Sequence, residues 1–242
     1  MSAWSRTKTQ LPATADESPG TAAKALSAII ERGSRVQAPA IKAYVDRLRE
    51  RNPNATPAEI VTKLEKHYMA AVTASGAAVG SAAAFPGVGT LAAMSAVAGE
   101  TVVFLEATAV YVLALAEVHG IPADHRERRR ALVLAVLVGE DSKHALADLI
   151  GPGRTSGAWV ADGAATLPLP AVSQLNSRLL KYFVKRYTLK RGALMFGKLL
   201  PVGIGAVVGG VGNRLMGKRI VANARNAFGN PPPRWPAALH VL

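Results

Sequence analysis

A lysine that follows two glycines at the spacing of a phosphate-binding loop is the first place where this sequence suggests chemistry. Gly192, Gly197 and Lys198 match that motif, in which backbone N–H groups and the lysine hold nucleotide phosphates. The motif also needs a Ser or Thr after the lysine, to hold Mg²⁺, and a strand before the loop. Leu199 has no hydroxyl and a basic helix is expected upstream, so we do not predict nucleotide binding here.

A second glycine-rich segment, Gly87 to Ala92, imitates a dinucleotide-binding fingerprint with Glu106 downstream. That fingerprint requires a strand immediately before the first glycine. Pro86 and a run of alanines stand at that place instead. We therefore interpret these glycines as a turn between two helices.

The histidines do not form a pattern typical of a metal site. The chain has five histidines and no cysteine, which excludes thiolate ligands and disulfides within it. Asp141 and His144 are spaced to share one helix face, but no second pair of this kind faces them, as a metal site in a helical bundle would need. We expect no metal ion, no cofactor and no catalytic residue.

Three glutamates, Glu100, Glu106 and Glu117, lie within an otherwise apolar stretch. The last two are eleven residues apart and therefore nearly on one helix face. We expect all three to be buried carboxylates that need cationic partners. The arginines at 126–130 are the candidates, which makes structural ion pairs the favoured interpretation over catalysis.

Composition and charge indicate a helical protein with an anionic partner. Half of the residues are hydrophobic but only 5% are aromatic, so small side chains that let helices approach closely dominate. Residues 1–162 hold 17 Lys and Arg against 16 Asp and Glu, while residues 163–242 hold 12 Lys and Arg and no acid. Such a basic region predicts binding to lipid headgroups or to nucleic acid.

Apolar residues recur at helical spacing and no segment alternates as a strand does, so we predict an all-α helical bundle. Thr56, Pro57 and Glu59 mark one helix start as cap, first-turn proline and capping-box acid. Residues 1–20 lack the apolar core of a secretory signal.

We expect three segments: a disordered N-terminal tail over 1–20, a single helical domain over 21–228 and a Pro-rich C-terminal tail over 229–242. Within the domain, residues 21–162 balance acids and bases, whereas residues 163–228 are strongly basic.

Two apolar stretches are each interrupted by a proline and paired glycines. Both predict small-residue, Gly/Ala-rich helical hairpins. The second stretch, Leu199 to Asn213, is about 22 Å long as a helix, which is shorter than a hydrocarbon core of ~30 Å. Cations on both of its sides favour lying at the membrane surface over crossing it. The hairpin turns are expected at Pro86, Gly87 and Gly89 and at Pro201, Gly203 and Gly205.

A basic amphipathic helix is expected over 178–191, before the second hairpin. Its cations and those around the hairpin would hold an anionic membrane surface. The lipid-binding residues that we predict are Arg178, Lys181, Lys185, Arg186, Lys190, Arg191, Lys198, Arg214, Lys218 and Arg219.

Several of these segments together resemble the EcsC family of bacterial proteins. The resemblance rests on Ala84-Phe-Pro-Gly-Val-Gly-Thr, the run from Glu106 to Gly120, the arginines at 126–130 and the segment Leu200-Pro-Val-Gly-Ile-Gly with Gly212-Asn-Arg-Leu-Met-Gly217. It covers roughly residues 55–228. It implies a helical, membrane-related protein whose founding relative is encoded beside an ABC transporter, and it implies no established activity.

The function expected from the sequence is non-enzymatic. A peripheral or monotopic protein at the cytoplasmic face of the cell membrane, binding anionic lipid and a protein partner, agrees best with the charge pattern. One alternative is a soluble helical module whose hairpins pack in its own core or in a homo-oligomer. A second alternative is a nucleic-acid-binding protein, although the sequence shows no motif typical of nucleic-acid recognition.

Overall fold

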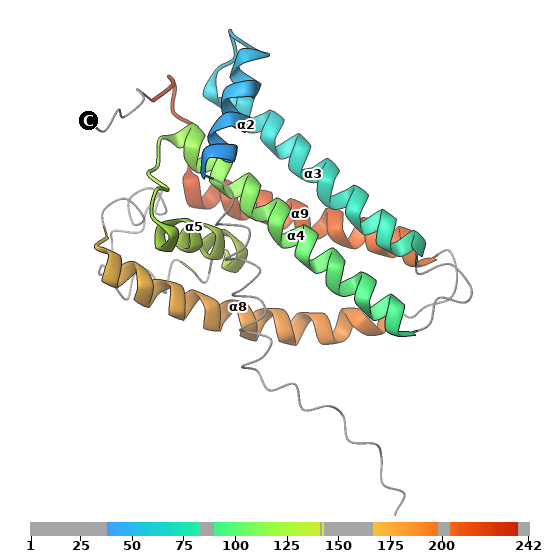
Figure 1. The fold of residues 1–242 in the computed structure, drawn as a ribbon. Helices are drawn as coiled ribbons and strands as arrows, with labels where there is room; N and C mark the ends of the chain where they lie inside the picture. The colour runs from blue at the N-terminus through green and yellow to red at the C-terminus, as the bar shows by residue number, and fades with distance from the viewer. Residues whose placement is uncertain (1–37, 83–89, 141, 143–166, 198–203, 237–242) are drawn as a thin grey trace, which may run out of the picture.

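Six helices make up the part of the chain that the computed structural model describes, which is residues 38–82, 90–140, 142, 167–197 and 204–236 (Figure 1). No strand occurs among these residues, so the prediction of an all-α fold is confirmed. The helices are α2 (Ala38–Glu50), α3 (Pro57–Ala82), α4 (Thr90–His119), α5 (Arg126–Val138), α8 (Leu169–Gly197) and α9 (Ile204–Phe228).

The start of α3 follows the expected capping pattern. The Thr56 backbone N–H donates to Glu59 Oε2 at 2.8 Å, and the Glu59 N–H donates to Thr56 Oγ1 at 3.3 Å. Both otherwise unsatisfied N–H groups of the first turn are thereby paired. The hydrogen bonds that the Glu59 carboxylate accepts from the Thr56 N–H and from the Thr56 hydroxyl lower the pKa of this carboxyl.

The core lies around α4 and α5, which the other helices cover. In Figure 1 the long helices α3, α4 and α9 lie together, and α5 lies between them and α8. Tyr111 to Ala116 of α4 are buried without interruption, as are Ala131 to Val138 of α5. A helix that is apolar on all sides must be enclosed by others, and these two stretches form that centre.

One helical stretch among the described residues, Gly99–His119, is long and apolar enough to cross a membrane, with a mean hydropathy of 1.8. It is the part of α4 that packs in the core, and 61% of its most apolar window is buried within the protein. A core helix of a water-soluble bundle has the same length and composition, so this stretch does not identify α4 as a membrane span.

Helices α3 and α9 make the most extensive contact between any two elements of the described chain. Gly217 lies within this contact, where an added Cβ would stand 2.9 Å from Val72 Cγ2 and 3.0 Å from Met69 Sδ. Beside it, the buried Asn213 side chain donates to the Val72 carbonyl at 3.1 Å. The missing side chain of Gly217 therefore allows Val72 and Met69 to pack directly against α9, while the amide of Asn213 fixes the register of the two helices.

Helix α8 packs along α5 and begins earlier than the sequence indicated. Its buried side chains include Leu175, Leu179 and Phe183, and Asn176 Nδ2 donates to Glu127 Oε2 at 2.7 Å. The expected helix over 178–191 is therefore the middle of a longer helix that starts at Leu169. Pro170 in the first turn does not prevent this start, because the first N–H groups of a helix have no intrahelical partner.

The C-terminal segment is packed against the bundle, which corrects the expectation of a tail over residues 229–236. Trp235 Nε1 donates to the Ala55 carbonyl at 3.2 Å, and the guanidinium of Arg49 lies 4.2 Å from the centre of the Trp235 ring. Gly120, with φ of 67°, faces Pro236 so closely that a Cβ would stand 2.8 Å from it. The aromatic ring, rather than regular structure, holds this segment in place.

One predicted hairpin residue is placed differently by the structure. Gly205 belongs to the first turn of α9, which begins at Ile204, so it is not part of the turn. A glycine is tolerated there because the first turn of a helix makes few backbone hydrogen bonds. The other five, Pro86, Gly87, Gly89, Pro201 and Gly203, lie outside the described residues.

Replacing Gly217 by alanine tests the close approach of α3 and α9. The Gly217→Ala variant should be about 1–3 kcal/mol less stable than the Gly212→Ala variant, because only the first introduces a crowded methyl group. Gly212 lies in the same helix with no atom near an added Cβ, so the helix-propensity gain is the same in both. Urea unfolding monitored by circular dichroism gives the comparison, and equal stabilities would contradict the packing.

The end of α4 carries a histidine whose environment makes stability depend on pH. His119 Nδ1 hydrogen-bonds to the Leu115 carbonyl at 2.8 Å, and its half-buried ring lies 5.2 Å from that of Phe228. Burial lowers the pKa of His119 below its ordinary value of 6.5, although the hydrogen bond to Leu115 opposes part of this shift. The folded protein therefore favours neutral His119, and this contribution is lost as the pH falls below 6.5.

Substituting His119 by phenylalanine should remove this pH dependence. We expect the free energy of unfolding of the wild type to decrease more than that of His119→Phe between about pH 7.5 and about pH 5.5. His125→Phe, at an exposed histidine before α5, is the matched control and should behave as the wild type does. The same pH response in all three proteins would contradict the assignment.

Candidate functional site

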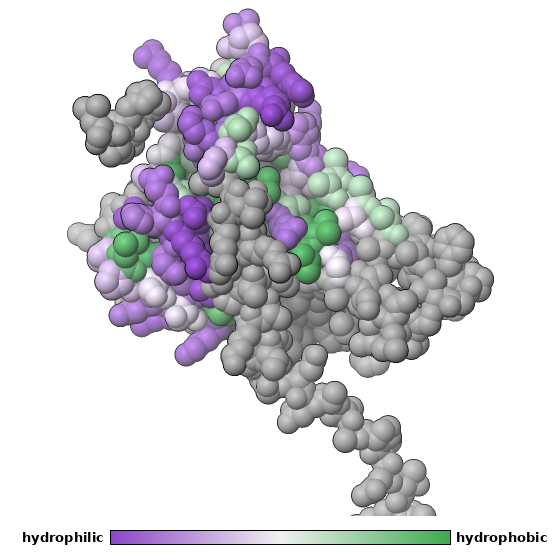
Figure 2. Space-filling model, viewed as in Figure 1, coloured by the Kyte–Doolittle hydropathy of each residue, from purple (hydrophilic) through white to green (hydrophobic). Residues whose placement is uncertain are grey.

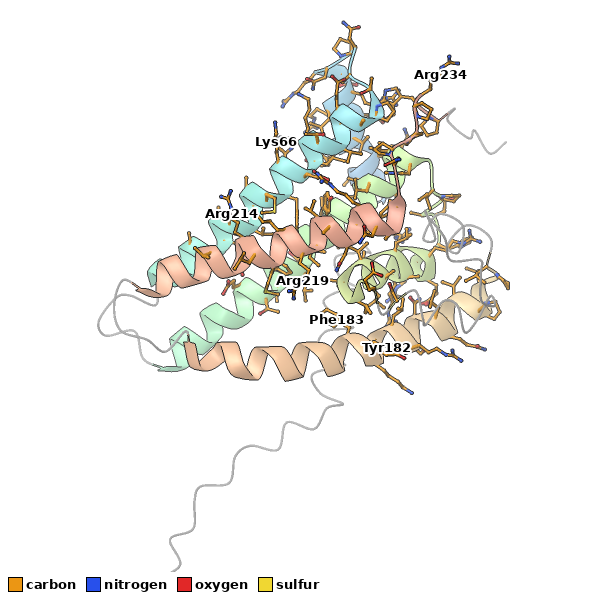
Figure 3. All side chains as sticks on the ribbon, turned by 180° about the vertical axis from the view of Figure 1, so that it is seen from behind. Lys66, Tyr182, Phe183, Arg214, Arg219 and Arg234 are labelled. Atoms are coloured by element: carbon orange, nitrogen blue, oxygen red, sulfur yellow. The ribbon has the colours of Figure 1, made fainter. Side chains whose placement is uncertain are left out.

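The structure places nine of the ten predicted lipid-binding cations on two helices, α8 and α9. Five of the ten have described side chains, and all five are exposed: Arg178 and Lys181 on α8, and Arg214, Lys218 and Arg219 on α9. In Figure 3, Arg214 extends from α9 toward α3, whereas Arg219 extends from the opposite edge of α9 toward α8. The side chains of the other five, Lys185, Arg186, Lys190, Arg191 and Lys198, lie outside the described part of the chain.

The α9 cations surround two exposed apolar side chains. Val211 is 50% exposed and Leu215 is 62% exposed, the highest fraction among the large apolar residues that the structure describes. They are four residues apart and therefore share one helix face, with the cations on both flanks. We call this set of five residues the α9 surface: Val211, Arg214, Leu215, Lys218 and Arg219.

A groove lies between α3 and α9 and borders the α9 surface. It has a volume of about 860 Å³ and is open to solvent along its length. Lys66 from α3 and Arg214 and Lys218 from α9 contribute its unpaired cations, since none of them bonds to another residue in the part of the chain described. Its apolar lining consists of Met69, Ala70, Ala74, Ala77, Val221 and Ala222. We call it the α3/α9 groove.

Among the described residues that line the groove, Glu65 is the one carboxylate, and Arg225 pairs with it. Arg225 Nε donates to Glu65 Oε1 at 2.7 Å and Nη2 donates to Oε2 at 2.5 Å, a bidentate contact between α9 and α3. The Glu65 side chain is only 11% exposed, whereas that of Arg225 is 66% exposed. This hydrogen-bonded ion pair raises the pKa of Arg225. The carboxylate is therefore neutralised and leaves the net charge of the groove positive.

Two stacked tyrosines lie behind the ion pair in the core. The rings of Tyr68 and Tyr111 are 4.7 Å apart and nearly parallel, and the Tyr68 hydroxyl bonds to Thr108 Oγ1 at 3.0 Å. Burial raises the pKa of both phenols, and the nearby Glu65 charge raises that of Tyr111 further. Both hydroxyls therefore stay protonated, which favours a structural role in joining α3 to α4.

The three glutamates predicted to be buried differ from one another. Glu100 is buried, Glu106 is half-buried and Glu117 is exposed, so the prediction is wrong for Glu117. The predicted spacing agrees with α4, because eleven residues place Glu106 and Glu117 on nearly the same side of a helix. That side also carries the exposed Val103 and faces solvent, since α4 is not enclosed along its whole circumference.

An exposed aromatic side chain lies on α8. Tyr182 is 44% exposed and is accompanied by the exposed Arg178 and Lys181. Figure 3 shows Tyr182 pointing away from the bundle while its neighbour Phe183 points inward to α5. Figure 2 shows the side of the molecule opposite to that in Figure 3. On this side, hydrophilic side chains gather at the end formed by α2 and the start of α3.

Four residues of this region were missed by the sequence reasoning. The sequence analysis places Val211 in an apolar hairpin and gives Leu215 no role, although their spacing among Arg214 and Lys218 is itself typical of an amphipathic surface. Glu65 and Lys66 follow directly on Leu64 in a core-facing helix, and nothing in that local pattern indicates a distant arginine partner.

Comparison of the chain with protein-family models, with curated proteins and with solved structures found no match. The likeness to the EcsC family therefore stays a prediction based on motifs. The candidate site rests on the geometry of α3 and α9 alone.

Substituting Glu65 and Arg225 separately tests which of the two residues needs its partner for the stability of the fold. Arg225→Met should lower the free energy of unfolding by about 1–3 kcal/mol, because the enclosed Glu65 carboxylate is left unsatisfied. Glu65→Gln should cost less than half as much, since the exposed guanidinium is solvated by water. Chemical denaturation of both variants measures the asymmetry, and an equal or larger loss in Glu65→Gln would contradict it.

Proposed function

We propose that this protein is a non-enzymatic peripheral membrane protein that binds an anionic lipid surface through the α9 surface. The observation that carries the proposal is the exposure of Val211 and Leu215 within a set of three cations that have no ion-pair partner in the described chain. An isolated exposed leucine is ordinary, but an apolar pair flanked by lysine and arginine is typical of helices that lie in a membrane interface.

The energetics of such a contact need both kinds of side chain. Burial of an exposed Leu or Val in the interface contributes about 1.5–3 kcal/mol when it is complete. Each cation near an anionic surface adds about 1 kcal/mol, and its aliphatic stem can lie along the apolar region while the charge stays with the headgroups. Neither term alone gives firm binding, but together they support reversible association.

The charge of the whole C-terminal third adds long-range attraction. Residues 163–242 hold 12 cations and no acid. All of those whose side chains the structure describes are exposed, and one of them, Arg225, pairs with Glu65. The inner leaflet of a cell membrane is anionic, so we place the protein at its cytoplasmic face. A protein partner at that membrane, and the membrane-related character implied by the EcsC resemblance, belong to the same proposal.

Removing the apolar pair should abolish most membrane binding. We expect the Val211→Ser/Leu215→Ser variant to bind anionic vesicles at least about tenfold more weakly, because its interfacial burial is lost. Val103→Ser is a matched control, since Val103 is 46% exposed on α4, outside the α9 surface. Co-sedimentation with phosphatidylglycerol-containing vesicles measures the difference.

The same co-sedimentation assay tests how binding depends on lipid charge, and a comparison with duplex DNA tests the alternative of nucleic-acid binding. Binding of the wild type should weaken as salt rises and should be lost with neutral phosphatidylcholine vesicles, because the attraction is electrostatic. Equal binding to neutral and anionic vesicles would contradict the proposal. Tighter binding to duplex DNA than to anionic vesicles would replace it with nucleic-acid binding.

A further inference from the structure

We propose that the α3/α9 groove holds one anionic phospholipid, with its phosphate between Lys66, Arg214 and Lys218. This inference deepens the proposed membrane association, on which it rests, by adding a stoichiometric lipid site to a diffuse surface contact. The α9 surface would touch many lipids at once, whereas the groove would take a single molecule.

The charge of the groove favours an anion. Its three unpaired cations come from both walls, Lys66 from α3 and Arg214 and Lys218 from α9. Its single acid, Glu65, is held by two hydrogen bonds from Arg225 and is only 11% exposed. A phosphate in the groove would therefore meet cations on two sides without a competing free carboxylate.

The apolar lining favours a lipid over a free phosphate ester. Met69, Ala70 and Ala74 contribute apolar atoms from α3, and Val221 and Ala222 do so from α9. An inorganic phosphate or a sugar phosphate would leave this surface in water. The volume of about 860 Å³ lies within the range of ligand sites and exceeds what a headgroup alone would fill.

The position of the groove connects it with the membrane. Arg214 and Lys218 belong both to the groove and to the α9 surface, and Leu215 lies between them in the sequence. A lipid in the groove would thus keep its headgroup beside the bilayer surface on which α9 rests. The walls are held at a fixed distance by the contact at Gly217 and by the Glu65–Arg225 ion pair, so the site is formed before the lipid binds.

Titration with a short-chain lipid tests the site in solution. Dihexanoyl phosphatidylglycerol, kept at concentrations where it is monomeric, should bind the full-length protein saturably and at one site by isothermal titration calorimetry. Dihexanoyl phosphatidylcholine lacks the net negative charge and glycerol 3-phosphate lacks the chains, so both should bind at least about tenfold more weakly.

Two substitutions separate the groove from general electrostatic attraction. Lys66→Gln should weaken phosphatidylglycerol binding about fivefold, and Arg47→Gln, the loss of one exposed cation on α2, should not. Ala74→Trp should abolish binding by filling the groove while every cation stays in place. Circular dichroism of each variant confirms that it is folded.

The outcomes distinguish this inference from the proposed function. Wild-type protein that sediments with anionic vesicles but does not bind the short-chain lipid would overturn the groove site and leave the membrane proposal standing. Saturable binding of the short-chain lipid without vesicle association would overturn the membrane proposal and leave the groove site standing. An equal loss in Lys66→Gln and Arg47→Gln, or full binding by Ala74→Trp, would also overturn the site.

Discussion

The contact between α3 and α9 is the constraint on which the rest of the structure depends. It joins segments about 140 residues apart in the chain, as the hydrogen bond from Asn213 to Val72 shows. Any side chain at position 217, where the two helices meet, would crowd Val72 and Met69. With α9 held there, its opposite side necessarily faces outward. The exposure of Val211 and Leu215 is thus a consequence of how α9 is packed, and so is the groove beside it.

The α9 cations differ in whether they have an acidic partner among the described residues. Arg225 forms a bidentate pair with Glu65 and thereby stabilises the α3–α9 contact. Arg214 and Lys218 lie further along the same flank of α9, within the groove, and have no acidic partner among the described residues. An exposed cation without a partner contributes little to the stability of the fold. The charges of Arg214 and Lys218 are therefore available to bind an anion.

Local signals predicted the helices, but they did not predict how the helices meet. The capping box at Thr56 and the basic helix around residues 178–191 could be predicted from neighbouring residues. The pairing of Glu65 with Arg225 could not, because it depends on a contact over 160 positions. The exposure of Glu117 and Leu215 was missed for the same reason. Periodicity shows which residues share a face, whereas the partners of that face are decided by the whole fold.

The most direct test of the account is the environment of residue 215 when the protein meets a membrane. Since the chain has no cysteine, Leu215→Cys and the control Ala43→Cys on α2 can each carry a single environment-sensitive fluorophore. On addition of anionic vesicles, we predict a blue-shifted and stronger fluorescence emission from position 215 and no change from position 43. An unchanged spectrum at position 215 under conditions where the protein sediments with the vesicles, or a shift at position 43 instead, would contradict the assignment of α9 as the membrane-binding surface.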